Sequence, residues 1–233
     1  MMNQTTIAVL LAGGKGTRLA SSVPKQFIEV NGRMILSYSL ETLLKHAGID
    51  GVWIVCEEAW RNQIRDEADK LKLPMEKLLG FSLPGERSRQ ESIRNALRDI
   101  VKLSPAHVLV HDAARPNLSV KMIDDCLEAL KSHDGVMPVL PMKDTVYYSE
   151  DGQQVSKLLE RDRIFCGQAP EAYDFKKYFD SNEALSLVDI SKVRGSTEPA
   201  VMAGMDIAMI PGDEHNFKIT TIADLERFRE QIQ

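Results

Sequence analysis

The amino-acid sequence predicts an α/β fold: a single Rossmann-like, mostly parallel sheet with helices on both faces and a protruding β-arm for dimerisation. Short apolar runs alternate with longer segments of helical spacing, which is the pattern of consecutive βαβ units. A length of 233 residues, with 43% hydrophobic and 27% charged residues, fits one domain over residues 1–233 and excludes a disordered or fibrous chain.

Each strand and helix is predicted from a local pattern. Apolar, partly β-branched runs bounded by turn or polar residues are expected to form strands, over residues 6–11, 52–55, 108–110, 136–140 and 207–211. Segments with apolar residues at helical spacing are expected to form helices, over residues 35–46, 59–72, 88–100, 120–132, 173–185 and 222–231. Alternation of the two implies right-handed crossovers and a sheet covered on both faces.

The stretch from about residue 142 to 166 departs from this alternation. Residues 145–148, a turn at 149–152, and the apolar Val155 and Leu158 have the pattern of a two-stranded hairpin. A hairpin that leaves a compact domain cannot bury both of its faces alone. We therefore expect this arm to pack on a second copy of the chain, giving a homodimer with shared active sites.

Composition excludes several classes of protein. The formal net charge of −5 offers no basic excess for nucleic-acid binding. The apolar stretches are far shorter than the roughly 20 residues of a membrane helix, so no membrane partner is expected. Three scattered cysteines argue against a disulfide framework or a metal-binding CxxC motif. The amino terminus shows no secretory signal pattern, and we expect a cytoplasmic protein.

The first predicted strand runs directly into a glycine-rich loop, LLAGGKGTRL at residues 10–19. Glycines there are expected to allow positive φ and a close approach of backbone N–H groups to a phosphate. Arg18 and Lys25 add positive charge beside the loop. The spacing excludes a Walker loop, but it only weakens a dinucleotide fingerprint, because Glu57 could supply the acidic residue. An NAD-dependent oxidoreductase and a catalytically silent nucleotide-binding protein therefore stay open as alternatives.

Six blocks of sequence carry a resemblance to a known family. They are the glycine loop with VPKQF (23–27), GERSRQESI (85–93), VLVHDAARP (108–116), KDT (143–145) with Arg161, QAP (168–170) and NFKIT (216–220). In this order they resemble the cytidylyltransferases that act on 2-C-methyl-D-erythritol 4-phosphate or D-ribitol 5-phosphate, which are similar to sugar-nucleotide pyrophosphorylases. The resemblance covers residues 7 to about 228.

The resemblance implies a Mg²⁺-dependent nucleotidyltransferase that joins CTP and a polyol or sugar phosphate to give a CDP-polyol and pyrophosphate. It implies three catalytic cations: Arg18, Lys25 and Lys218. It implies a nucleotide site made by Leu11, Ala12, Gly13, Gly14, Gly16, Gly85, Ser92, Asp112 and Ala113. It implies an acceptor site made by Arg115, Thr145 and Arg161, the last two reaching from the partner's arm.

Asp112 and its neighbour His111 are interpreted with the reaction that the resemblance implies. Asp112 closes a predicted strand, and open α/β sheets bind ligands beyond the carboxyl ends of their strands. A carboxylate beside a triphosphate is a natural ligand for Mg²⁺, so Asp112 is the expected metal ligand. His111 is expected to be structural, because a phosphate oxygen is already a nucleophile and needs no general base.

Three segments depart from the family pattern. Glu86 stands where the family has a second glycine, and Ala169 replaces a hydroxyl-bearing residue. The segment 194–199 occupies the place of an acidic, hydroxyl-bearing block. We therefore expect an altered acceptor pocket that favours ribitol 5-phosphate or another linear polyol or sugar phosphate over methylerythritol phosphate. The pathway, isoprenoid precursor or cell-wall polyol biosynthesis, stays open.

Overall fold

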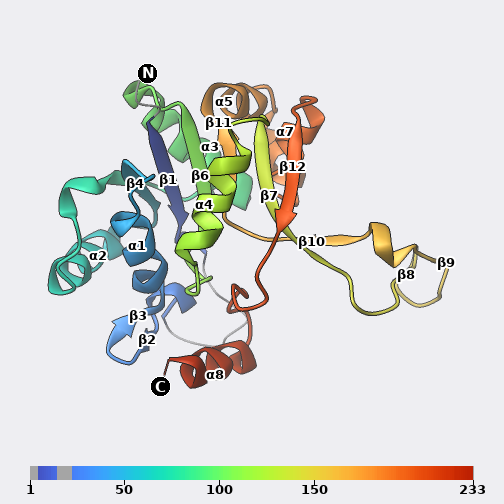
Figure 1. Ribbon diagram of the computed structural model, residues 1–233, viewed down its shortest axis with the longest axis horizontal. Coiled ribbons are helices and arrows are strands. Elements are labelled where there is room, and N and C mark those ends of the chain that lie inside the picture. Colours follow the sequence, from blue (N-terminus) through green and yellow to red (C-terminus); the bar gives the residue numbers. More distant parts are fainter. Residues whose placement is uncertain (1–4, 15–22, 233) are drawn as a thin grey trace.

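The computed structural model describes residues 5–14 and 23–232. Within these residues, eight strands form one mostly parallel sheet with the order β10-β7-β11-β6-β1-β4-β5, and β12 also pairs with β7 (Figure 1). The strands are β1 (Thr6–Leu11), β4 (Gly51–Val55), β5 (Leu78–Ser82), β6 (His107–Asp112), β7 (Gly135–Pro141), β10 (Phe165–Gly167), β11 (Glu171–Asp174) and β12 (Ile207–Pro211). Only β10 and β11 run antiparallel to their neighbours in this sheet. The predicted α/β class with a mostly parallel sheet is confirmed.

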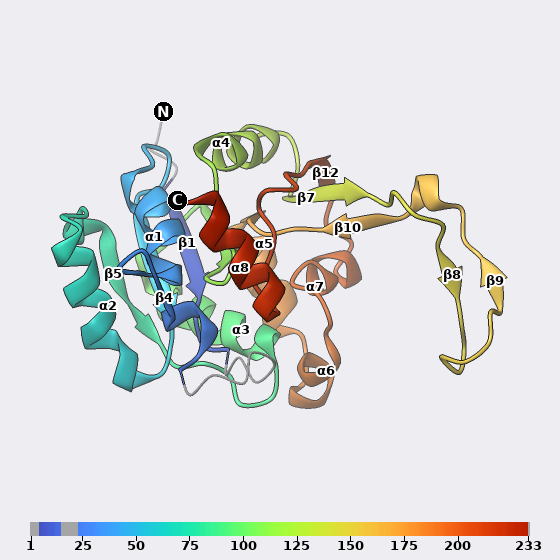
Figure 2. The ribbon, with the colours of Figure 1, turned by 90° about the horizontal axis from the view of Figure 1, so that it is seen from below.

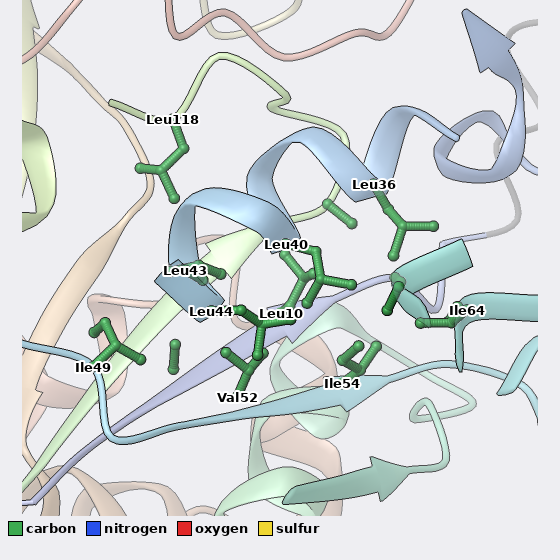
Figure 3. Close-up of a cluster of buried hydrophobic side chains, with 14 of the residues drawn as sticks. Leu10, Leu36, Leu40, Leu43, Leu44, Ile49, Val52, Ile54, Ile64 and Leu118 are labelled. Atoms are coloured by element: carbon green, nitrogen blue, oxygen red, sulfur yellow. The ribbon is translucent and has the colours of Figure 1, made fainter. Parts of the chain in front are cut away.

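Helices cover both faces of the sheet. They are α1 (Ile35–Lys45), α2 (Glu58–Lys70), α3 (Arg89–Ile100), α4 (Val120–Ala129), α5 (Phe175–Glu183), α6 (Leu187–Lys192), α7 (Glu198–Met202) and α8 (Ile222–Gln231). Successive side chains of a strand point to opposite faces, and β1 shows the result. Ala8 and Leu10 pack toward α1, α2 and α4, and Ile7 and Val9 pack toward α3, α5 and α7. In Figure 3 the leucines of α1 point toward Leu10, Val52 and Ile54.

The last helix forms a small core of its own against the start of α1. Phe228 and Leu225 of α8 pack with Ile35 and Ile219, and the ring of Phe228 meets Tyr38 edge to face at 5.1 Å between centroids. The backbone N–H of Ile219 donates to the carbonyl of Ala114 at 2.8 Å. Residues 216–220 are thereby held beside the carboxyl end of β6.

The structure corrects the prediction of a helix over residues 173–185. Residues 171–174 form β11 instead, an antiparallel strand between β6 and β7, and α5 begins at Phe175. The Asp174 side chain accepts a bond from the backbone of Lys177 and caps the helix there. The strands β5 and β10, the pair β2 (Glu29–Val30) and β3 (Arg33–Met34), and the short helices α6 and α7 were not predicted.

The arm forms the expected hairpin. β8 (Tyr147–Tyr148) and β9 (Lys157–Leu158) pair antiparallel at its end, and β7 and β10 pair at its base. Figure 2 shows the hairpin extending away from the layered body. Tyr147, Val155 and Leu158 are 59–66% exposed, so the single chain leaves the apolar side chains of the arm uncovered. Of the helices that the structure describes, none is long and apolar enough to cross a membrane.

Candidate active site

A cavity of about 440 Å³ opens beyond the carboxyl ends of β1 and β6. Eight residues of the predicted site line it: Leu11, Gly13, Gly14, Lys25, Gly85, Ser92, Asp112 and Lys218. Ala12 and Ala113 are buried directly behind this lining. Gly16 and Arg18 lie outside the described residues. Segments far apart in the sequence therefore meet at the edge of the sheet where the fold class predicts a ligand.

The glycine loop leaves β1 as a continuation of the sheet. The N–H of Ala12 donates to the carbonyl of Val55 at 2.8 Å. The buried side-chain amide of Gln26 then donates to the carbonyls of Ala12 and Gly14, at 2.5 and 2.9 Å. Because both carbonyls are held from the protein side, the loop has a defined shape at the cavity wall.

The expected positive φ is not found at Gly13 or Gly14. In the described part of the chain, the glycines with positive φ lie elsewhere, at Gly32, Gly152 and Gly204. Gly13 is required for packing instead, since a Cβ there would lie 2.4 Å from the Cβ of Pro84. The absence of a side chain lets the loop after β1 pack directly on the segment before α3.

That second segment is closed by bonds to the first turn of α3. The N–H of Gly85 donates to the Ser92 hydroxyl at 2.9 Å, and a Cβ on Gly85 would lie 2.7 Å from the backbone nitrogen of Ser92. The Ser88 hydroxyl caps α3 by accepting from the N–H of Glu91 at 3.1 Å. Glu86 is exposed and lines the cavity, so the departure at this position leaves the loop closed around Gly85 and Ser92.

Three cations surround the carboxylate of Asp112. Arg89 Nε lies 2.9 Å from Oδ1, Lys218 Nζ lies 2.9 Å from Oδ2, and Arg115 Nε lies 3.7 Å from Oδ2. Burial by itself would raise the pKa of Asp112, but Arg89 and Lys218 outweigh it and hold that pKa well below its ordinary value. The carboxylate of Asp112 is thus ionised. Together with its three cations it forms a cluster of net positive charge, which suits a polyphosphate.

Arg115 and His111 fix the turn that follows β6. Arg115 Nη1 donates to the carbonyl of Asn216 at 2.7 Å, and its side chain is only 13% exposed. His111 Nε2 lies 3.0 Å from the carbonyl oxygen of Arg115, which can only accept, so Nε2 carries the hydrogen. Burial lowers the pKa of His111 to about 4. His111 is therefore neutral near pH 7 and has the structural surroundings expected of it.

Thr145 and Arg161 lie on the arm and do not line the cavity of their own chain. Thr145 is exposed, and Arg161 Nη1 donates to the carbonyl of Lys143 at 3.0 Å. Arg115, the third residue assigned to the acceptor, lies beside Asp112 but is not among the residues that line the cavity. The described lining of this cavity therefore includes none of the three residues predicted for the acceptor.

Of the residues that line the cavity and were not predicted, two hold the site together. Gln26 holds the glycine loop, and Arg89 joins Asp112 to Ser196, whose hydroxyl accepts from Arg89 Nη1 at 2.8 Å. Gln26 lies in the block VPKQF and Arg89 lies in the block GERSRQESI, and both blocks carry the family resemblance. Membership of these blocks is the feature of the sequence from which the two residues could have been predicted. Among the residues that the structure describes, no cluster of three or more His, Cys, Asp or Glu side chains forms a metal site.

Comparisons with known proteins agree with this geometry. The family model described as 2-C-methyl-D-erythritol 4-phosphate cytidylyltransferase matches residues 6–231. A protein of that name from Thermotoga neapolitana is 37% identical over 225 residues, covering 96% of this chain and 95% of the relative. A ribitol-5-phosphate cytidylyltransferase from Streptococcus pneumoniae is 31% identical over 231 residues, covering 97% and 98% of the two chains.

Solved structures give the same result. The 2-C-methyl-D-erythritol 4-phosphate cytidylyltransferase of Francisella tularensis superposes with a TM-score of 0.80 at 27% identity, covering 97% of this chain and 99% of that one. These comparisons give no support to the oxidoreductase alternative. The resemblance carried by the six blocks is confirmed, and the chain belongs to the 2-C-methyl-D-erythritol 4-phosphate cytidylyltransferase family.

Proposed function

We propose that this chain, a nucleotidyltransferase by its family, transfers the cytidylyl group of CTP to a polyol phosphate in the cavity beside Asp112. An oxygen of the acceptor phosphate attacks the α-phosphorus of CTP, the bond to the β-phosphate breaks, and pyrophosphate leaves with the electron pair. No proton has to be removed, so the work of the protein is positioning and charge stabilisation. The observation that carries the proposal is the group of cations around Asp112.

Lys25 and Lys218 are the described cations that we assign to the transition state, together with Arg18. Both lysines line the cavity. The ammonium group of Lys218 donates a hydrogen bond to Asp112, which fixes its position there. The glycine loop and the segment at Gly85 and Ser92 face the same cavity and supply the nucleotide site. Preorganised cations of this kind stabilise charge as it develops on the transferred group.

Mg²⁺ fits this arrangement through a single carboxylate. Each oxygen of Asp112 accepts one bond from a cation and keeps a further lone pair. Mg²⁺ is commonly held by one or two carboxylates, waters and substrate phosphates, so Asp112 would hold it together with the triphosphate. The ion would neutralise charge on the phosphates. Removal of Mg²⁺ by a chelator should abolish turnover and leave the fold unchanged by circular dichroism.

Pyrophosphate release tests the activity. Purified protein, CTP and Mg²⁺ are incubated with a panel of polyol and sugar phosphates, and the Lys25→Ala variant serves as the negative control. We expect release with at least one linear polyol phosphate and a large loss in the variant without loss of ellipticity. No release with any acceptor, or full activity of the variant, would contradict the proposal.

The arm supports a two-fold dimer with shared active sites. Its apolar side chains are uncovered, and Arg161 lies outside the cavity of its own chain. Mixing Asp112→Asn chains with Arg161→Ala chains should raise activity at acceptor concentrations below KM, because each heterodimer regains one intact site. A monomeric mass in light scattering, or no gain on mixing, counts against the dimer.

The acceptor is proposed to be ribitol 5-phosphate or another linear polyol or sugar phosphate. Ala169 is buried and has no hydroxyl, and the hydroxyls of Ser196 and Thr197 bond to protein groups. Each hydroxyl left unpaired costs about 1–3 kcal/mol, roughly 5- to 150-fold in kcat/KM. The test is kcat/KM for both acceptors at saturating CTP. A preference of about tenfold or more for methylerythritol phosphate would overturn this assignment.

A further inference from the structure

The segment 194–199, which departs from the family pattern, meets the start of β11 in one buried cluster. Glu171, at the start of β11, accepts a hydrogen bond from the hydroxyl of Ser196 in the segment 194–199. Tyr173 OH lies 2.9 Å from Thr197 Oγ1 and 3.4 Å from Glu171 Oε2. All four side chains are buried, Ser196 with 2% of its surface exposed and Tyr173 with none. The hydroxyls of Ser196 and Thr197 thus face the protein and not the cavity.

The cluster is joined to Asp112 by one side chain. Arg89 Nη1 donates to the Ser196 hydroxyl at 2.8 Å, and Arg89 Nε donates to Asp112 Oδ1 at 2.9 Å. A guanidinium is a rigid planar group, so two bonds from two of its nitrogens fix its position and its plane. A change in the position of the Ser196 hydroxyl is therefore expected to change the position of the Arg89 guanidinium, and with it that of the Asp112 carboxylate.

The charges of Arg89, Asp112 and Glu171 also act on one another. Burial raises the pKa of Glu171, and Arg89 acts against that rise. Burial by itself would lower the pKa of Arg89, but the charges of Asp112 and Glu171 outweigh it and raise that pKa. Arg89 thus bonds directly to Asp112, and its charge also acts on Glu171 through the bonded Ser196 hydroxyl between them.

We propose that Arg89 is a positioning residue for Asp112, and that Ser196 and Glu171 are the anchor that holds Arg89 in place. The proposal rests on the function assigned to the cavity above. It gives the segment 194–199 a role in placing Asp112 and Lys218 relative to the nucleotide, in addition to any effect on the acceptor. Glu171 and Ser196 then form a bonded pair that joins the start of β11 to the segment 194–199.

Steady-state kinetics of Ser196→Ala test this role, with Ser39→Ala as the matched control. Ser39 is fully buried in α1 and its hydroxyl donates to the carbonyl of Leu36, so the control also loses one buried hydroxyl. We expect kcat of Ser196→Ala to fall about tenfold with KM for CTP changed less than about threefold, because only Asp112 and Lys218 shift while the glycine loop and the segment at Gly85 and Ser92 stay in place. Arg89→Lys, which keeps the charge but cannot make both bonds, should lower kcat at least as much.

A thermodynamic cycle provides a readout that needs no activity. Free energies of unfolding are measured in denaturant for Ser196→Ala, Asp112→Asn and the double variant. Ser196 and Asp112 share Arg89 as a partner, so their effects should be non-additive. If the wild-type protein released no pyrophosphate, the function would fail while this cycle still tested the coupling.

The outcomes separate the alternatives. A lower kcat in Ser196→Ala alone, together with a non-additive cycle, supports the positioning role. Unchanged kcat in Ser196→Ala, an equal loss in Ser39→Ala, or an additive cycle would each overturn it.

Discussion

Asp112 and Leu158 lie at opposite extremes of this chain. Asp112 closes a fully paired strand, is 7% exposed and is bonded to side chains from two other segments. Leu158 is 63% exposed on a strand of two residues at the end of the arm. The cavity is fixed by contacts within the chain, whereas the arm has few such contacts of its own. The comparison teaches that contacts within one chain are sufficient to fix the cavity but leave the apolar side chains of the arm uncovered.

The largest difference between the core and the arm is expected in the unfolding free energies of two matched leucine-to-alanine variants. Leu40→Ala removes a side chain that is 1% exposed in the core under α1 and should cost about 2–5 kcal/mol of unfolding free energy. Leu158→Ala should cost less than about 0.5 kcal/mol in dilute solution. Denaturant melts at low and high protein concentration measure both. Equal losses at low concentration would show that the arm packs on its own chain.

Removal of Lys218 should disable the cavity without unfolding the chain. Its ammonium bonds to Asp112 and its side chain is 33% exposed toward the cavity, so Lys218→Ala should lower kcat by about 10²- to 10³-fold. Lys121→Ala is the control, because Lys121 pairs with Asp125 on the surface of α4 and should leave kcat unchanged. Retained turnover in Lys218→Ala would remove the lysine from the assigned machinery.

A substitution on the arm should change KM for the acceptor and leave KM for CTP unchanged. Arg161→Ala should raise KM for the acceptor about tenfold and leave KM for CTP and the melting temperature unchanged, because a phosphate contact is lost outside the nucleotide site. Arg163→Ala is a close control, since Arg163 lies on the same short helix and pairs with Glu160 at 3.1 Å. A parallel change in KM for CTP would indicate that the arm serves the donor half as well.

The smallest expected effect is an acid-dependent loss at α8. Burial by itself would raise the pKa of Asp224, but bonds from Thr220 and Thr221 outweigh it and lower that pKa from 3.8 to about 2. The unfolded chain then binds a proton before the folded one does, so stability present above about pH 4 is lost as the pH falls through 2.

Partial exposure reduces the size of this effect to roughly 1 kcal/mol. Asp224→Asn should lack the step, as seen in melts between pH 5 and 2. An identical acid profile in the variant would assign the loss to other carboxylates.

Local patterns were sufficient for the strands that make up most of the sheet. β1, β4, β6, β7 and β12 were each predicted, because each is a continuous apolar run bounded by turn or polar residues. β11 was missed, because the helical spacing of Phe175, Tyr178 and Phe179 was extended back to residue 173. Only pairing with β6 and β7 makes residues 171–174 a strand. β5 was missed because Gly80 interrupts it. That glycine gives room to the Trp53 ring, 2.6 Å from where a Cβ would lie.

The site shows the same division. Asp112, Gly85 and Lys218 stand in recognisable blocks and were predicted. The roles of Gln26 and Arg89 could not be predicted, because their partners are backbone carbonyls of another loop and a serine 107 residues away. Contacts over such separations leave no periodicity in the sequence. The burial of the hydroxyls in the segment 194–199 could not be foreseen for the same reason.

Gln26 has a consequence for the time course of nucleotide binding. Its amide carries two hydrogens, and both are committed, one to the carbonyl of Ala12 and one to that of Gly14. Opening of this part of the loop requires both bonds to break at once while the amide stays buried, so it should be rare on the timescale of encounters with the nucleotide. CTP would then bind to a loop that already has a fixed conformation. The amide of Ala12, which donates to the carbonyl of Val55, should exchange slowly with deuterium before any ligand is added.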